Sequence, residues 1–217
     1  MTYLIWILLV VLAVGQPAAK GPAMAPSEVL GVHANADHAA LQGKVYVALG
    51  DSISAGRYAT ASDDTFPAVV AEKLGMSLDL VARSGAKAGW GITQMSAVQA
   101  AQPGLVTIEL GTRGLPRGGR IGSWLPSTTI DAIIADTCER HGGTFVSLSG
   151  FYQVNQFHAQ DGGSSYLGRS DWFHPGDQGH AAIAAAVLSV LGAGPAPVVG
   201  PLPSPSRFPD VIRTHPK

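Results

Sequence analysis

Two short motifs, far apart in the chain, hold the three residue types that act together in acyl transfer. Ser52 lies in the triplet Gly50-Asp51-Ser52 after a short apolar run, and Asp171 and His174 lie three residues apart in the segment DWFHP. A serine hydroxyl becomes a nucleophile when a histidine takes its proton, and a carboxylate on the other ring nitrogen fixes the histidine tautomer. The residues therefore predict a serine hydrolase, provided that the fold brings the two motifs together.

Each motif also has a simpler interpretation. The Gly-Asp-Ser triplet is typical of a turn whose polar side chains cap the following helix, and DWFHP is compatible with a surface turn. A metal site is a further alternative, in which Asp171 and His174 are joined by Asp177 or His180. The presence of a serine together with an Asp-His pair favours nucleophilic catalysis over these alternatives.

The strands and helices that would position these residues alternate along the chain. Short β-branched apolar runs predict strands, and apolar residues at i, i+3 and i+4 predict helices. The predicted strands are Lys44–Leu49, Leu78–Ala82, Leu105–Leu110 and Thr144–Leu148, and the predicted helices are Phe66–Leu74, Ile92–Ala101, Ser127–His141 and Asp177–Leu191. This alternation predicts a parallel sheet covered by helices on both faces, with ligands bound beyond the carboxyl ends of the strands.

The composition excludes several classes of protein. The 217 residues are 46% apolar and 13% charged, and 14 Lys and Arg residues balance 15 Asp and Glu residues. Such a chain is not disordered as a whole, and it lacks the basic footprint of a nucleic-acid-binding protein. Cys138 is the single cysteine, so the chain has no intramolecular disulfide and no cysteine-based zinc site. We expect Cys138 to be a small buried apolar residue.

The two ends of the chain differ from its central part. Residues 3–14 form an unbroken apolar run that is too short to span a bilayer and is followed by small residues, which is typical of a secretory signal peptide. An uncleaved anchor and a buried N-terminal element are the alternatives. The predicted organisation is a signal peptide or anchor over residues 1–25, a linker over 26–39, a folded domain over 40–191 and a Pro-rich disordered tail over 192–217. We therefore expect a secreted or extracytoplasmic protein.

Three segments follow one another in an informative order. They are VALGDSISAG (Val47–Gly56), VARSGAKAG (Val81–Gly89) and DWFHP (Asp171–Pro175), and each follows a predicted strand or precedes a predicted helix. In these segments, over nearly all of the predicted domain, the chain resembles the GDSL/SGNH hydrolases, a family of esterases and lipases. The resemblance implies a three-layer α/β/α sandwich with a mainly parallel central sheet, and a reaction that needs neither a metal nor another cofactor.

The resemblance also implies a role for each matched residue. Ser52 would be the nucleophile, His174 the general base and Asp171 the carboxylate that orients the base. The main-chain amides of Ser52 and Gly85 would donate to the oxyanion. The implied substrate is an acyl ester of a small molecule, a carbohydrate or a lipid. No nucleic acid partner is expected, and contact with a membrane would be made only through the N-terminal segment.

One block departs from the family pattern Gly-x-Asn-Asp, whose asparagine completes the oxyanion hole. The sequence here is Gly111-Thr112-Arg113-Gly114, so Arg113 stands where the asparagine is expected. The guanidinium of Arg113 has donors for an oxyanion, or it could pair with a carboxylate such as Glu109. Loss of one oxyanion donor costs about 10²–10³ in kcat. A catalytically impaired SGNH-like binding domain is therefore the alternative to an active ester hydrolase.

The chain is also short at this place. Residues 112–126 are rich in glycine and proline and contain neither the helix nor the further central strand that the family has there. We infer an internal deletion. A sheet that lacks an interior strand must re-pair the neighbouring strands or leave an exposed edge. A fully regular sheet is therefore not expected in this part of the fold.

Overall fold

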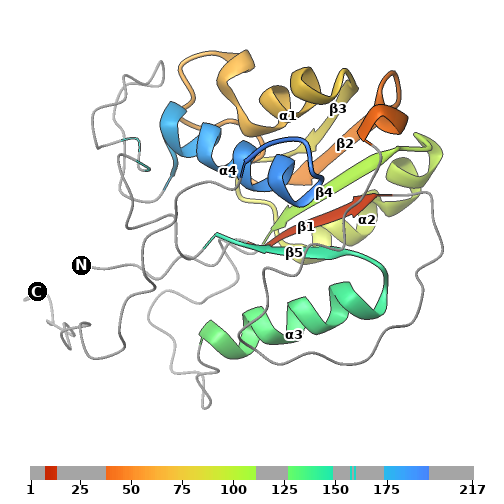
Figure 1. Cartoon of the computed structure of the whole chain (residues 1–217). Helices are drawn as coiled ribbons and strands as arrows, with labels where there is room; N and C mark the ends of the chain where they lie inside the picture. The colour runs from red at the N-terminus through yellow and green to blue at the C-terminus, as the bar shows by residue number, and fades with distance from the viewer. Residues whose placement is uncertain are drawn as a thin grey trace, which may run out of the picture.

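The computed structural model describes residues 8–13, 38–110, 127–148, 157, 159 and 174–195, which form a layered α/β arrangement (Figure 1). The strands are β1 (Leu8–Ala13), β2 (Val45–Gly50), β3 (Ser77–Ala82), β4 (Leu105–Leu110) and β5 (Thr144–Ser147). The α-helices are α1 (Phe66–Leu74), α2 (Ala88–Ala100), α3 (Ser127–Arg140) and α4 (Asp177–Val190), and short 3-10 helices cover His38–Leu41 and Ser62–Asp64. All of the predicted strands and helices are confirmed, with differences only at their ends.

Strands β2, β3 and β4 form the parallel part of the sheet, whose full order is β3-β2-β4-β1-β5. β2 lies between β3 and β4 and pairs parallel with both. Gly50, the last residue of β2, is opposite Ala82 of β3 and Glu109 of β4. The carboxyl ends of the three strands are therefore level at one edge, which is where parallel sheets bind their ligands.

Strand β1 comes from the apolar run near the N-terminus and lies inside the sheet (Figure 1). It pairs antiparallel with β4, where Leu8 is opposite Leu110, and antiparallel with β5, where Leu8 is opposite Ser147. The sheet is thus mixed, and the N-terminal segment fills the place where an interior strand was expected to be missing. The predicted signal peptide includes β1, so cleavage after it would remove this strand. Cleavage itself stays a prediction.

None of the helices in the described part of the chain has the length and apolar character needed to cross a membrane.

Alternate residues of β2 face two different layers of helix. Tyr46 and Ala48 belong to a core cluster that includes residues of α1 and α4. Val47 packs on the opposite face with Val98 of α2, and Leu49 packs there with the segment that leads into α2. This is the two-residue period of a strand that is buried on both faces. The described residues therefore form an α/β fold with helices on both sides of a mixed sheet, in which the three strands β3, β2 and β4 are parallel and the pairings of β1 depart from the predicted parallel order.

The ends of α1 follow directly from the local sequence. The side chain of Thr65 accepts a hydrogen bond from the N–H of Ala68, and Pro67 lies in the first turn, where a missing N–H costs little. Gly75 ends the helix with a φ of 62°, in the left-handed region that glycine adopts readily. These end signals set the bounds of α1, which packs against α4.

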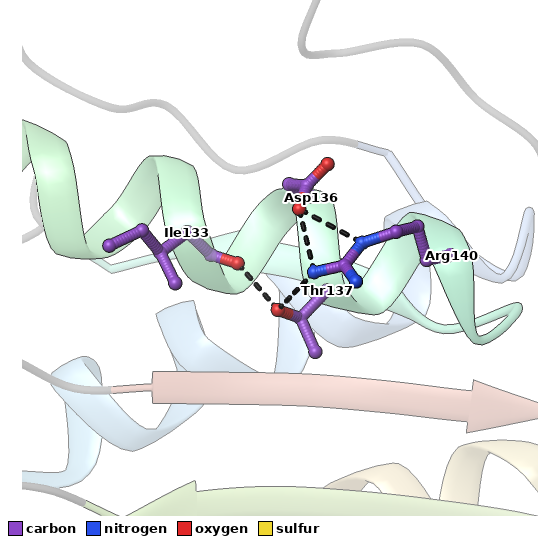
Figure 2. A network of polar contacts seen from close by, with 4 residues as sticks. All are labelled: Ile133, Asp136, Thr137 and Arg140. Carbon is purple, nitrogen blue, oxygen red and sulfur yellow. Dashed lines mark hydrogen bonds and ion pairs between the residues drawn. The ribbon is translucent and has the colours of Figure 1, made fainter.

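Helix α3 carries a polar network on its exposed side (Figure 2). Arg140 and Asp136, one turn apart, form an ion pair at 2.8 Å, and the Thr137 hydroxyl donates to the carbonyl of Ile133 at 2.7 Å. Exposed pairs of this kind add only about 0.3–0.5 kcal/mol to a helix. On the same helix Cys138 is buried, as predicted, and burial raises the pKa of its thiol.

Candidate active site

Ser52 lies just beyond the carboxyl end of β2, in a turn that only glycine allows. A Cβ at Gly50 would overlap the side chain of Ser54 and would lie 2.8 Å from the main-chain oxygen of Glu109. The N–H of Asp51 donates to this same oxygen at 3.0 Å, which extends the pairing of β2 with β4 by one residue. Ser52 is therefore the first residue that is free of the sheet.

Ser52 and His174 are neighbours although 122 residues separate them in the chain. Ser52 Oγ and His174 Nε2 lie 2.8 Å apart, whereas Ser52 Oγ lies 3.4 Å from Asp51 Oδ1. The exposed fractions of Ser52 and His174 are 6% and 9%, so both are almost enclosed by protein. In the tautomer with its proton on Nδ1, His174 accepts the serine proton at Nε2, which is the arrangement of a nucleophile with its base.

The main-chain amides of residues 51–54 are used in an uneven way. Asp51 and Ser54 donate to Glu109 Oε2 at 3.3 and 3.1 Å, and Ile53 donates to Asp51 Oδ1 at 3.2 Å. Within the part of the chain that the structure describes, the amide of Ser52 donates to no other residue. An amide of the nucleophile that has no internal acceptor is suited to donate to an oxyanion.

Glu109 is fully buried beside the buried side chain of Asp51. Burial and the neighbouring charge of Asp51 hold the pKa of Glu109 well above its ordinary value, although hydrogen bonds from Ser54 act in the opposite direction. The neutral acid of Glu109 therefore persists to a higher pH than it does in an exposed glutamate.

Both the main chain and the ring of His174 contact neighbouring residues. The carbonyl of His174 accepts from the N–H of Ala159 at 2.9 Å, and the N–H of Gly176 donates to the carbonyl of Phe157 at 2.9 Å. The ring of Tyr58 meets the imidazole edge-on, with 5.4 Å between the two centroids. Tyr58 has a φ of 68°, a left-handed conformation that costs energy for a bulky residue and is often found at functional sites.

A second link joins the loop after Ser52 to the start of α4. The N–H of Thr60 donates to Asp177 Oδ1 at 2.7 Å, and its hydroxyl donates to Oδ2 at 2.6 Å. Asp177 is the first residue of α4 and lies three residues after His174. The carboxylate of Asp177, one of the alternative metal ligands, is therefore hydrogen-bonded to Thr60. This contact links the loop that follows Ser52 to the segment that contains His174.

His180, the other alternative metal ligand, is buried within α4. Its Nδ1 accepts from the N–H of Phe66 at 3.3 Å, and the two rings stack with 6.4 Å between centroids. Burial lowers the pKa of His180 to about 4. The main chain of Arg57 and the charge of Asp177 raise this pKa, but their effect is smaller than that of burial. His180 thus joins α4 to α1 as a neutral packing residue. Among the described residues, no three His, Cys, Asp or Glu side chains gather as metal ligands would.

The other predicted site residues are placed only in part. Gly85 lies in the turn after β3 with a φ of 79°, a conformation that favours glycine. The N–H of Arg83 donates to the carbonyl of Gly50 at 3.1 Å, which holds this turn beside the strand that leads to Ser52. Asp171 and Arg113 lie outside the described residues, so their roles stay predictions.

Sequence reasoning missed three features of this site. The sequence suggests Glu109 only as a partner of Arg113, although an acid inside the apolar run LVTIEL is a usable signal, because a buried carboxyl group requires donors. The ring of Tyr58 and the bond between Thr60 and Asp177 left no signal in the sequence. Their partners lie more than a hundred residues away, and only the fold brings them together.

Comparison with known proteins gave no match to any family model and none to a curated protein sequence. The assignment of a function to this site therefore depends on the residues and the geometry described above.

Proposed function

We propose that the protein is a serine ester hydrolase of the SGNH kind, with Ser52 as the nucleophile and His174 as the general base. The observation that carries the proposal is the 2.8 Å contact between Ser52 Oγ and His174 Nε2. Residue types alone singled out these two residues in the sequence. The enclosure of both side chains and the position of Ser52 at the carboxyl edge of the sheet support the same function.

In the proposed reaction His174 takes the hydroxyl proton as Ser52 Oγ attacks the acyl carbonyl carbon. The oxyanion of the tetrahedral intermediate accepts hydrogen bonds from the amides of Ser52 and Gly85. When the ester C–O bond breaks, His174 gives the proton to the leaving alcohol. Water then hydrolyses the acyl-enzyme, with His174 again as base, and releases the carboxylic acid. Asp171, three residues before His174, is proposed to hold the Nδ1 proton throughout.

Covalent labelling is the direct test of this function. A fluorophosphonate reagent should modify Ser52, because a serine activated by a histidine reacts where ordinary serines do not. Ser52→Ala should abolish the modification, and Ser62→Ala, which removes an exposed serine further along the same segment, is the matched control. The modified peptide is identified by mass spectrometry. Labelling that survives Ser52→Ala at full yield would refute the assignment.

Ester hydrolysis separates the proposed enzyme from a binding domain that has kept only part of the site. The purified protein should hydrolyse a short-chain activated ester, at a rate that rises with pH over the range in which a histidine loses its proton, about pH 6 to 7. Equal rates for the wild type and Ser52→Ala would favour the non-catalytic domain.

Two variants test Arg113, which stands where the family pattern has an asparagine. If its guanidinium donates to the oxyanion, Arg113→Ala should lower kcat by about 10- to 10³-fold with little change in KM. If Arg113 is a degenerate replacement, Arg113→Asn should raise kcat, because it restores an amide donor. An unchanged kcat in both variants would show that residue 113 lies outside the oxyanion site.

A further inference from the structure

We propose that Glu109 is a positioning residue that holds the turn of Ser52 in its reactive conformation. This role rests on the function proposed above. Glu109 lies on β4 and reaches the turn after β2 from the neighbouring strand, so it acts on the nucleophile from outside its own segment.

A single oxygen of Glu109 gathers three donors from this turn. Glu109 Oε2 accepts from the N–H of Asp51 at 3.3 Å, from the N–H of Ser54 at 3.1 Å and from the hydroxyl of Ser54 at 3.0 Å. The N–H of Asp51 also reaches the main-chain oxygen of Glu109, so this amide is shared between two acceptors. Both sides of Ser52 are therefore fixed to the same carboxyl group, while Ser52 itself is not bound by it.

This arrangement has a consequence for the amide of Ser52. The amides of Asp51, Ile53 and Ser54 all point to internal acceptors, and within the described residues the amide of Ser52 has none. With the flanking amides fixed, the turn cannot rotate the Ser52 N–H toward an internal acceptor. The same fixation sets the direction of Ser52 Oγ toward His174.

The surroundings of Glu109 favour its neutral form, which still offers Oε2 as an acceptor. The side chain is fully buried, Asp51 is buried beside it, and burial with the charge of Asp51 raises the pKa of Glu109. A glutamine has nearly the same shape and offers an oxygen to the same three donors, and its NH2 group takes the place of Oε1, which is buried and has no hydrogen-bond partner within the described residues. Glu109→Gln should therefore preserve the turn, and Glu109→Leu should release it.

The test compares these two variants by labelling and by steady-state kinetics. Glu109→Leu should lower the rate constant of fluorophosphonate labelling and kcat by about 10²-fold with little change in KM, because a misplacement of about 1 Å is enough for such a loss. Glu109→Gln should react at close to the wild-type rate. Glu72→Gln, which changes an exposed glutamate on α1, is the matched control for the loss of one acid. Rescue by glutamine distinguishes positioning from a requirement for charge.

Each outcome supports or overturns the role of Glu109. If Glu109→Leu reacts like the wild type, or if Glu109→Gln is as slow as Glu109→Leu, the proposal is wrong. If Glu109→Leu does not fold, Ser54→Ala takes its place: it removes one donor from Glu109 Oε2 and should slow labelling by about 10-fold, and an unchanged rate overturns the role.

Failure of the proposed function gives a different result from failure of the role of Glu109. If wild-type protein is not labelled and does not hydrolyse esters, the proposed function fails. The turn is then examined by hydrogen exchange at the amide of Ser54, whose acceptor is the Glu109 side chain and which should exchange slowly in the wild type and in Glu109→Gln and fast in Glu109→Leu. Equal exchange in all three proteins would overturn the role of Glu109 by itself.

Discussion

The buried ring of His180 predicts a loss of stability in acid that a single substitution removes. Its Nδ1 accepts from the N–H of Phe66, so the ring must be neutral at this nitrogen in the folded protein. Burial lowers the pKa of His180 from the ordinary 6.5 to about 4. Between these two values the unfolded chain binds a proton that the folded protein does not bind. The stabilisation is therefore complete above pH 6.5 and is lost as the pH falls toward 4.

The size of this loss of stability follows from the difference between the two pKa values of His180. At 1.36 kcal/mol per pKa unit, the lowered pKa of His180 corresponds to about 3 kcal/mol of unfolding free energy between pH 7 and pH 4. His180→Asn keeps an acceptor at the position of Nδ1 and cannot be protonated. The variant should be less stable than the wild type at pH 7, because the ring is lost, but its stability should fall less in acid.

Urea unfolding at pH 7, 6, 5 and 4 measures this difference. The free energy of unfolding of the wild type should fall by about 3 kcal/mol more than that of His180→Asn over the series, since the titration of the other groups is common to both proteins. His141→Asn, at the exposed turn after α3, is the control for the removal of one histidine and should follow the wild type. Parallel curves for the wild type and His180→Asn would refute the reasoning.

Two further predictions concern contacts around the site, and a third concerns the N-terminus. Asp177→Asn weakens both hydrogen bonds from Thr60, and urea unfolding should show a loss of about 1 kcal/mol; no loss would mean that this link contributes nothing. Gly50→Ala places a Cβ against Ser54, and the melting temperature should fall by several degrees, as expected for about 1–3 kcal/mol of overpacking. N-terminal sequencing of secreted protein should find a start between residues 20 and 27, whereas an intact N-terminus would favour β1 as a permanent strand.

The sequence by itself determined four of the five described strands, the four α-helices and the two motifs, whereas the apolar run that forms β1 was expected to be a signal peptide. Apolar periodicity and end signals such as Thr65 and Gly75 are local properties, which is why the predicted strands and helices agree with the structure. The chemistry of Ser52 and His174 was also evident from residue type, because few side chains can act as a nucleophile with a base. The alternation of strands and helices also predicted that Ser52 lies at the carboxyl edge of the sheet.

Only the tertiary structure decided which distant residues meet and how burial changes them. The place of β1 between β4 and β5 depends on pairing between segments far apart in the chain, and its apolar run gave no register. The bonds from Thr60 to Asp177 and from the turn of Ser52 to Glu109 are long-range contacts of the same kind. Desolvation lowers the pKa of His180 and raises that of Glu109, and it arises only when the packed core excludes water from these groups.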